Sequence, residues 1–326
     1  MQDLTLRTQL SMQQLVHNIA DMVVAVFGDR ILSVYLGGSF SRGQLTETSD
    51  LDMNVVFRGS LSDEEYEHFM TVRTALQPFS PLRLEMYPTD ESKIKSRPAD
   101  ASTRSSICLY GEDFLPDVPA LTIEAFAMRS MHKAIHYMTV LRGRPNRNPL
   151  PLDYPDATQS YYGYTQYGDF DGAQAFQPGT RIILGMLARC TTALLAIEHG
   201  IEAQTKPESI QQYRTIIDGE WGSFVQDVYD VIKTELHYEL PQNVIVQKHL
   251  SQLLHRLLAF ENDAIARFKP TIVASLQSDD RRQKKLALVA LKNIQMNDSD
   301  ILQALAAITE CDDEALLNEV RAKNGV

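Results

Sequence analysis

Apolar residues recur at helical spacing near the start of the chain and at alternate positions soon after it. Residues 5–27 predict an amphipathic helix, and Ser62-Asp-Glu-Glu65 has the form of a capping box that opens a second helix to about Leu76. Around these helices, three segments show the alternation of half-buried strands, at 32–36, 51–57 and 82–87. The first 120 residues therefore predict an α/β domain with a mixed sheet. On the apolar face of the first helix lie Ile19, Val23 and Val26.

From residue 121 onward the apolar pattern is helical almost throughout. Helices are expected at about 122–142, 181–199, 207–217, 220–239 and 244–268. The dipeptide Lys269-Pro270 marks a boundary, after which three short amphipathic helices resemble HEAT-type repeats. The predicted fold class is therefore α+β, in three parts. These are a mixed-sheet α/β domain at 1–120, an all-α domain at 121–269 and a short HEAT-like helical extension at 270–326.

Two carboxylates mark the start of the second predicted strand. Asp50 and Asp52 are two residues apart, so on a strand both side chains lie on one face, opposite to that of Leu51. Oxygen ligands placed side by side are the ligands that Mg²⁺ prefers. The sequence therefore predicts a magnesium site at this position.

A glycine-rich turn, Gly37-Gly38-Ser39, follows the first predicted strand. Glycine lets the backbone approach a ligand closely, and a turn that opens a helix offers N–H groups, here with a hydroxyl, to a phosphate. Arg42 lies one turn further on and is a second candidate phosphate ligand, with a solvated helix arginine as the alternative. A phosphate site and a metal site on one edge of a sheet predict a nucleoside triphosphate bound as its Mg²⁺ complex.

A third carboxylate is expected on the strand at 82–87. There Arg83 and Glu85 alternate with apolar residues, so both lie on the polar face. A strand beside Asp50 and Asp52 would bring Glu85 to the metal, as a further ligand or a general base, and Arg83 to a phosphate. The neighbouring acids Asp90 and Glu91 are the alternatives.

Gly38, Ser39, Asp50, Asp52 and Glu85 resemble, position by position, the pattern of the nucleotidyltransferase superfamily of the DNA polymerase β type. The resemblance implies a mechanism in which Asp50 and Asp52 bridge two Mg²⁺ ions roughly 3.5–4 Å apart. It also implies in-line transfer at the α-phosphorus of a nucleoside triphosphate, with pyrophosphate as the leaving group.

Two later segments resemble aminoglycoside adenylyltransferase-like proteins. Leu109-Tyr-Gly111 is similar to the strand and turn that close their catalytic domain, and Arg181 opens a helix similar to one in their helical domain. The resemblance gives Lys206 a contact with the triphosphate, with a solvated lysine beside Pro207 as the alternative. The streptomycin- and spectinomycin-modifying members have acids just before that arginine. Here the sequence is Phe176-Gln-Pro-Gly-Thr180, which argues against an aminoglycoside acceptor.

These features predict a Mg²⁺-dependent enzyme that transfers AMP from ATP to a hydroxyl group of a small molecule. The alternative is a protein-modifying nucleotidyltransferase, or an antitoxin-like regulator, that docks a partner protein or self-associates through its C-terminal helices. A nucleotide-binding scaffold without activity is a third hypothesis, against which the full set of three carboxylates argues. The tyrosine-rich stretch 143–179 is expected to be a substrate-side loop, with a loop packed on the helical domain as the alternative.

Composition narrows the partners and the compartment. Lys and Arg number 31 against 42 Asp and Glu, and the net charge of −11 argues against nucleic acid as a partner. The longest apolar stretch, near 182–197, contains Arg189 and is expected to be too short for a membrane span. Three widely spaced cysteines predict reduced thiols, and the first residues lack a leader pattern, so we expect a cytoplasmic protein.

Overall fold

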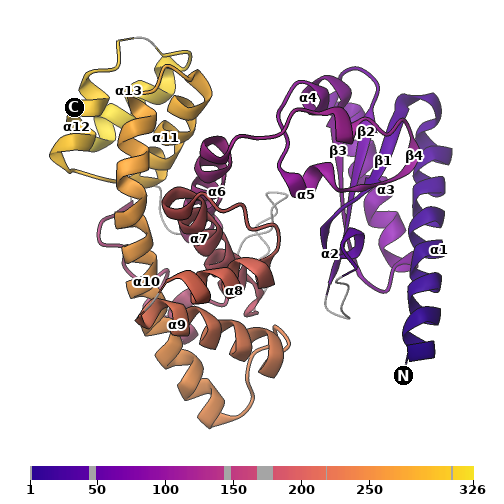
Figure 1. Cartoon of the computed structure of the whole chain (residues 1–326), viewed down its shortest axis with the longest axis horizontal. Helices are drawn as coiled ribbons and strands as arrows, with labels where there is room; N and C mark the ends of the chain where they lie inside the picture. The colour runs from indigo at the N-terminus through magenta and orange to yellow at the C-terminus, as the bar shows by residue number, and fades with distance from the viewer. Residues whose placement is uncertain (1, 44–48, 143–147, 167–178, 218, 310) are drawn as a thin grey trace. The chain divides into compact units, whose positions relative to one another are not determined.

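The computed structural model describes residues 2–43, 49–142, 148–166, 179–217, 219–309 and 311–326, with side chains from residue 11 onward. The chain forms two compact units, Met1–Leu121 and Thr122–Val326, and each is described by itself (Figure 1).

The first unit is built on a four-stranded sheet in the order β3-β2-β1-β4 (Figure 1). β1 is antiparallel to both β2 and β4, whereas β2 and β3 are parallel, with helix α3 (Asp63–Leu76) between them in the chain. The predicted mixed sheet is thus confirmed. The strands are β1 (Ile31–Leu36), β2 (Asp50–Phe57), β3 (Arg83–Asp90) and β4 (Ile107–Gly111).

Different elements cover the two faces of this sheet. α1 (Gln2–Phe27) and α3 pack on the face that carries Leu51 and Met53. On the opposite face, Tyr35 and Val56 pack against a segment that includes Ala99. This segment contains the short helices α4 (Glu91–Lys95) and α5 (Ala101–Arg104). Because side chains alternate along β2, Asp50 and Asp52 lie on the face that this segment covers.

The apolar face of α1 is shorter than the sequence pattern indicates. Ile19 and Val23 are fully buried against the sheet, as predicted, but Val26 is 49% exposed. Val26 lies in the last turn of α1, directly before the chain turns into β1.

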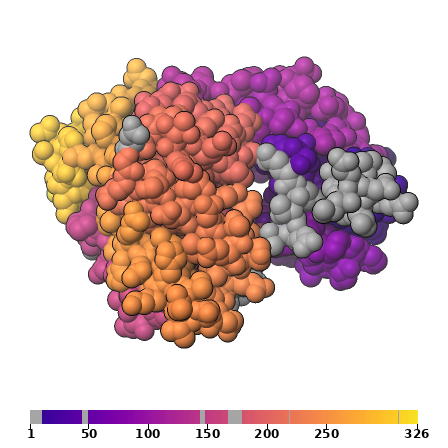
Figure 2. Space-filling model, turned by 60° about the horizontal axis from the view of Figure 1, so that its bottom comes forward, coloured from indigo at the N-terminus to yellow at the C-terminus, as the bar shows by residue number. Residues whose placement is uncertain are grey.

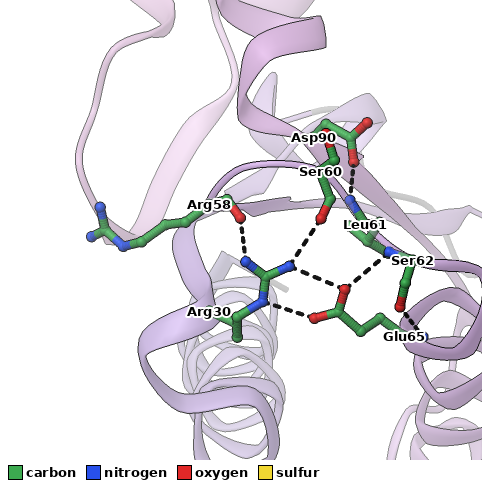
Figure 3. Close-up of polar contacts among 7 residues, drawn as sticks. All are labelled: Arg30, Arg58, Ser60, Leu61, Ser62, Glu65 and Asp90. Atoms are coloured by element: carbon green, nitrogen blue, oxygen red, sulfur yellow. Dashed lines mark hydrogen bonds and ion pairs between the residues drawn. The ribbon is translucent and has the colours of Figure 1, made fainter.

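α3 begins with the predicted capping box. The hydroxyl of Ser62 accepts a hydrogen bond from the Glu65 N–H at 3.2 Å, and the Glu65 carboxylate accepts one from the Ser62 N–H at 3.0 Å. The same carboxylate accepts bonds from Nε and Nη2 of Arg30 at 2.7 and 3.1 Å (Figure 3). One glutamate therefore caps the helix and pairs with a cation from the start of β1.

Arg30 also fixes the turn between β2 and α3. Its guanidinium donates to the backbone carbonyls of Arg58 and Ser60 (Figure 3). Asp90, at the end of β3, accepts a bond from the Leu61 N–H at 2.8 Å and pairs with Lys93. We call Arg30, Glu65 and Asp90, with the backbone groups they bind, the Arg30 network. It holds the ends of β2 and β3 that lie away from Asp50.

The second unit is helical, and its buried residues form one core. Its longer elements are α6 (Ile123–Met138), α7 (Arg181–His199), α8 (Lys206–Ile216), α9 (Glu220–Tyr229), α10 (Val244–Leu276), α11 (Arg281–Asn293), α12 (Ser299–Ala306) and α13 (Glu314–Asn324). A short parallel pair, β5 (Asn148–Pro149) and β6 (Ile294–Gln295), joins two distant segments.

Helix α10 continues past the position where the sequence pattern ends it, near residue 268. It runs through Pro270 to Leu276. Proline removes one backbone N–H donor from the helix. The apolar spacing nevertheless continues, because Phe268, Ile272 and Leu276 are all buried in the core.

The C-terminal helices α11, α12 and α13 bury their apolar faces in this same core. Figure 2 shows the same continuity at the surface, where the yellow C-terminal helices adjoin the rest of the second unit. Arg281 pairs with Asp312 at 2.8 Å, and Lys285 pairs with Asp313 at 3.1 Å. Two of the basic residues of α11 thus tie this helix to the start of α13.

Two other helices differ in length from the prediction. The helix expected at 220–239 divides into α9 and a π-helical turn at Asp230–Glu235, followed by positive φ angles of 49° at His237 and 69° at Tyr238. The helix expected at 122–142 ends at Met138. There the Thr139 hydroxyl donates back to the Ile135 carbonyl at 2.7 Å, a bond with which serine and threonine compete with regular helix.

The described part of the tyrosine-rich stretch packs on α10. The Leu152 backbone exchanges two hydrogen bonds with the Asn262 side chain, at 2.6 and 3.1 Å. The hydroxyls of Tyr154 and Tyr162 lie 2.5 and 2.7 Å from the two ring nitrogens of His255. Residues 148–166 therefore follow the alternative interpretation, a loop packed on the helical domain, whereas 143–147 and 167–178 lie outside the described residues.

Helix α7 is long and apolar enough to cross a membrane by length and composition, although we expected this stretch to be too short. It is the one helix of that kind among the residues described. Its most apolar window is 72% buried inside the protein, so packing in the core of the second unit accounts for its composition.

Candidate active site

The register of β2 and β3 brings the predicted carboxylates to one face. Asp50 lies opposite Arg83 in the parallel pairing, and Asp52 lies opposite Glu85. Side chains at paired positions of neighbouring strands lie on the same face of a sheet. Asp50, Asp52 and Glu85 are all half-buried, and Nε of Arg83 lies 3.5 Å from Oε1 of Glu85. Two strands thus present three acids and one cation together.

The glycine turn meets this group of acids directly. The Gly37 N–H donates to the Asp52 carbonyl at 2.9 Å, and α2 (Gly38–Ser41) starts at the next residue. Gly38 has a φ of +66°, and a Cβ built on it would lie 1.8 Å from Oδ2 of Asp52. A side chain at this position would displace the Asp52 carboxylate, and the positive φ also favours glycine.

Ser39 and Arg42 lie on the same short helix and just after it. Ser39 is the second residue of α2, and both residues are half-buried. Nη1 of Arg42 donates to the Ser102 hydroxyl at 3.0 Å, which directs the arginine to the α5 segment. Arg42 is therefore partly buried and hydrogen-bonded, and its contact with a phosphate stays a prediction.

Two serines adjoin the site without having been singled out from the sequence. Ser102 binds Arg42, and Oγ of Ser106 lies 3.5 Å from where a Cβ on Gly37 would be. Ser102 and Arg42 are 60 positions apart, so no local sequence pattern links them. The run Ser102-Thr-Arg-Ser-Ser106, rich in hydroxyl groups, is the one sequence signal that could have indicated this segment.

Lys206 lies in the second unit, as the first residue of α8. Thr205 caps this helix, because its hydroxyl accepts a bond from the Glu208 N–H at 3.1 Å. The contact of Lys206 with a triphosphate stays a prediction, since the other candidate residues belong to the first unit.

The chemistry of the donor set fits a divalent cation. Three carboxylates on neighbouring strands offer the oxygen ligands that Mg²⁺ takes. Among the described residues, however, no three His, Cys, Asp or Glu side chains are gathered closely enough to hold a metal ion. Carboxylates repel one another, and Glu85 pairs with Arg83, so a cation would have to draw these oxygens together. Asp50, Asp52 and Glu85 are the residues that would hold it.

Residues 20–121 match the family model described as a nucleotidyltransferase domain. The match spans the sheet, the glycine turn, the three carboxylates and the α5 segment. The first unit is therefore a nucleotidyltransferase domain, and the protein is an enzyme of this type. The superfamily that the motif predicted is confirmed.

One similar solved structure is spectinomycin adenyltransferase AAD(9) from Enterococcus faecialis, determined with ATP and spectinomycin. It is 12% identical, with a TM-score of 0.44, over 75% of this chain and 98% of that chain. No curated protein matches the chain. The assignment of the first unit accordingly rests on the family model and on the arrangement of the site.

Proposed function

We propose that the protein transfers AMP from ATP to a hydroxyl group of a small molecule and releases pyrophosphate. The observation that carries this proposal is the register of β2 and β3, which pairs Asp52 with Glu85 while the Asp52 carboxylate abuts Gly38. A glycine turn that opens a short helix beside three carboxylates suits a triphosphate bound with a divalent cation.

Each residue of the site has a distinct role in this proposal. Asp50, Asp52 and Glu85 would hold Mg²⁺, two ions in all, and the metal would supply positive charge against the triphosphate. Ser39 and the N–H groups at the start of α2, after Gly37, would bind phosphate oxygens. Arg42 and Arg83 would offset the charge that develops on the leaving pyrophosphate. Lys206 is a further candidate for a contact with the triphosphate.

The proposed nucleotidyl transfer forms one bond at the α-phosphorus and breaks another. The acceptor oxygen forms a bond to the α-phosphorus while the bond from that phosphorus to the bridging oxygen of the β-phosphate breaks. Pyrophosphate leaves with the electron pair, and the proton of the acceptor hydroxyl passes to a base, for which Glu85 is the candidate. Alignment of the three atoms contributes much of the rate in reactions of this kind.

The sequence narrows the acceptor within this proposal. Polycationic acceptors require acids in their pocket, and the segment Phe176-Gln-Pro-Gly-Thr180 before α7 has none. A neutral polyol-like small molecule fits this composition better than an aminoglycoside does.

Calorimetry tests the donor half of the proposal. ATP, GTP, CTP and UTP are titrated, with and without Mg²⁺, into the wild type and into the Asp50→Asn/Asp52→Asn double variant. We expect Mg²⁺-dependent binding of ATP that the double variant loses. The titrations are repeated with metabolites from a cell extract, in case an acceptor must bind first. Absence of ATP binding under both conditions would overturn the proposal.

Labelled ATP tests the acceptor half. The protein is incubated with [α-³²P]ATP and a cell extract, and the small-molecule and protein fractions are separated. Label in the small-molecule fraction, absent with the double variant, supports the proposal. Label confined to protein bands would instead favour a protein-modifying enzyme.

A further inference from the structure

The α5 segment, residues 99–106, lies along the glycine turn and α2. Ser106 faces Gly37, just before the start of α2, and Ser102 binds Arg42, just after its end. Asp50 and Asp52 lie on the face of the sheet that this segment covers, as the alternation along β2 requires. The segment is therefore next to the candidate phosphate site at two independent points.

The α5 segment is firmly held by the rest of its unit. Oδ1 of Asp100 accepts bonds from both the N–H and the hydroxyl of Thr103, each at 2.8 Å. Nη2 of Arg104 donates to the Pro116 carbonyl at 3.1 Å, and the Ala99 N–H donates to the Pro119 carbonyl at 2.9 Å. Ser102 and Ser106 thus stand on a fixed support, so little ordering is needed when a ligand binds.

We propose that the α5 segment forms a second wall of the triphosphate site. The Ser106 hydroxyl donates a hydrogen bond to a phosphate oxygen held at the Gly37–Gly38 turn. Ser102 is a positioning residue, which holds the guanidinium of Arg42 toward the same phosphates. This inference rests on the proposed function and deepens it, because it names two residues that the motif does not contain.

Charge explains why such a wall is useful at this position. The Asp52 carboxylate lies against Gly38, so a phosphate that approaches the turn meets a like charge. A hydroxyl donor and an anchored arginine offset this repulsion without adding another flexible cation. An arginine side chain loses rotamer freedom when a ligand fixes it, and the hydrogen bond from Arg42 to Ser102 restricts that freedom before the ligand arrives.

Nucleotide binding by calorimetry, with ATP and Mg²⁺, measures both contacts. Ser106→Ala loses a hydrogen bond to a charged group, so we expect the Kd to rise about 10-fold or more. Ser102→Ala removes the hydrogen bond between Ser102 and Arg42. Because this effect on the phosphates is indirect, we expect the Kd of this variant to rise less, about 3-fold to 10-fold. The matched control is Ser105→Ala, since Ser105 lies between them and is exposed, and the hydrogen bond described for its hydroxyl goes to the Ser102 carbonyl.

A double-mutant cycle separates positioning from direct contact. If Ser102 acts through Arg42, Ser102→Ala changes the Kd of the wild type but not that of the Arg42→Gln variant. Ser102→Thr and Ser106→Thr keep a hydroxyl and should restore binding. Melting temperatures of all variants exclude loss of fold as the cause of weaker binding.

The outcomes distinguish this inference from the function on which it rests. A wild type that binds no nucleotide, alone or with extract metabolites, removes the proposed function and the inference with it. A wild type that binds ATP, together with alanine variants that bind equally well, overturns the inference and leaves the function standing. Two further results would overturn the inference. One is an equal loss of ATP binding in Ser105→Ala. The other is a Ser102→Ala substitution that raises the Kd as much in the Arg42→Gln variant as in the wild type.

Discussion

β2 and β3 run side by side, and acidic residues lie near both ends of the pair. The acids at the two ends have different interaction partners. At the start of the strands, Asp50, Asp52 and Glu85 share one face as neighbouring carboxylates, with Arg83 beside Glu85. At the far end, each acid has a cation and a backbone N–H as partners. Glu65 binds Arg30 and the Ser62 N–H, and Asp90 binds Lys93 and the Leu61 N–H.

The two ends differ in what the acids do for stability. The hydrogen bonds from Arg30 and the Ser62 N–H lower the pKa of Glu65 from its ordinary 4.5 to about 2, so folding favours its charged form. Neighbouring carboxylates repel one another, and this repulsion opposes folding. The acids at the two ends of the strands therefore differ in what their neighbours do to a negative charge.

The strongest test of this difference is to neutralise one glutamate at each end of the β2–β3 pair. Glu85→Gln should slow pyrophosphate release by at least about 100-fold, since a positioned acid or base contributes that much, with little change in melting temperature. Glu65→Gln should lower the melting temperature and leave the rate per folded molecule unchanged. The comparison fails if Glu85→Gln destabilises the protein more than Glu65→Gln does.

Glycine substitutions at the two ends give the next largest difference. Gly38 and Gly59 have φ angles of +66° and +67°, so alanine at either costs about 1 kcal/mol in backbone conformation. Only at Gly38 does the added Cβ also meet the Asp52 carboxylate, whereas nothing lies within 4 Å of a Cβ on Gly59.

We therefore expect Gly38→Ala to abolish most nucleotide binding and Gly59→Ala to leave it intact. Chemical unfolding measures the shared backbone cost, and calorimetry with ATP measures the difference. Equal loss of binding in both variants would show that backbone strain, and not the place of Gly38 beside Asp52, sets the effect.

Acid titration gives the smallest expected effect. A lowered carboxyl pKa contributes stability that is present above the unfolded pKa, 4.5 for glutamate, and is lost as the pH falls toward the folded value of about 2. The pKa of Asp90 is lowered too, chiefly by its hydrogen bond with Lys93, and acts in the same direction. Unfolding followed from pH 6 down should show a steeper loss of stability in wild type than in Glu65→Gln, below about pH 4.5. Parallel curves would remove Glu65 from the stabilising group.

Much of the first unit could be predicted because its signals are local. The Ser62-to-Glu65 capping box and the alternation along β2 and β3 each lie within a few residues, and short-range geometry decides them. The pairing of Glu85 with Asp52 could be expected as well, since both strands carry their acids on the polar face.

Other features depend on contacts that a local pattern does not encode. The approach of Ser102 to Arg42 links positions far apart in the chain and needs the folded support of the α5 segment. Helix α10 passes Pro270 because burial of Ile272 and Leu276 outweighs one lost hydrogen bond, a balance set by the core around it. The roles of the acids and of Lys206 toward a nucleotide stay predictions.

All four strands of the first unit's sheet lie within the first 121 residues, and among the residues that the structure describes no strand of the second unit joins them. Domains generally fold as units, the N-terminal one first, while the ribosome is still at work. The strands, the glycine turn and the three carboxylates can therefore assemble before the helical unit has been made. A nascent chain that has emerged only a little beyond residue 121 would already carry the glycine turn and the three carboxylates. The order of synthesis therefore favours early assembly of the candidate site.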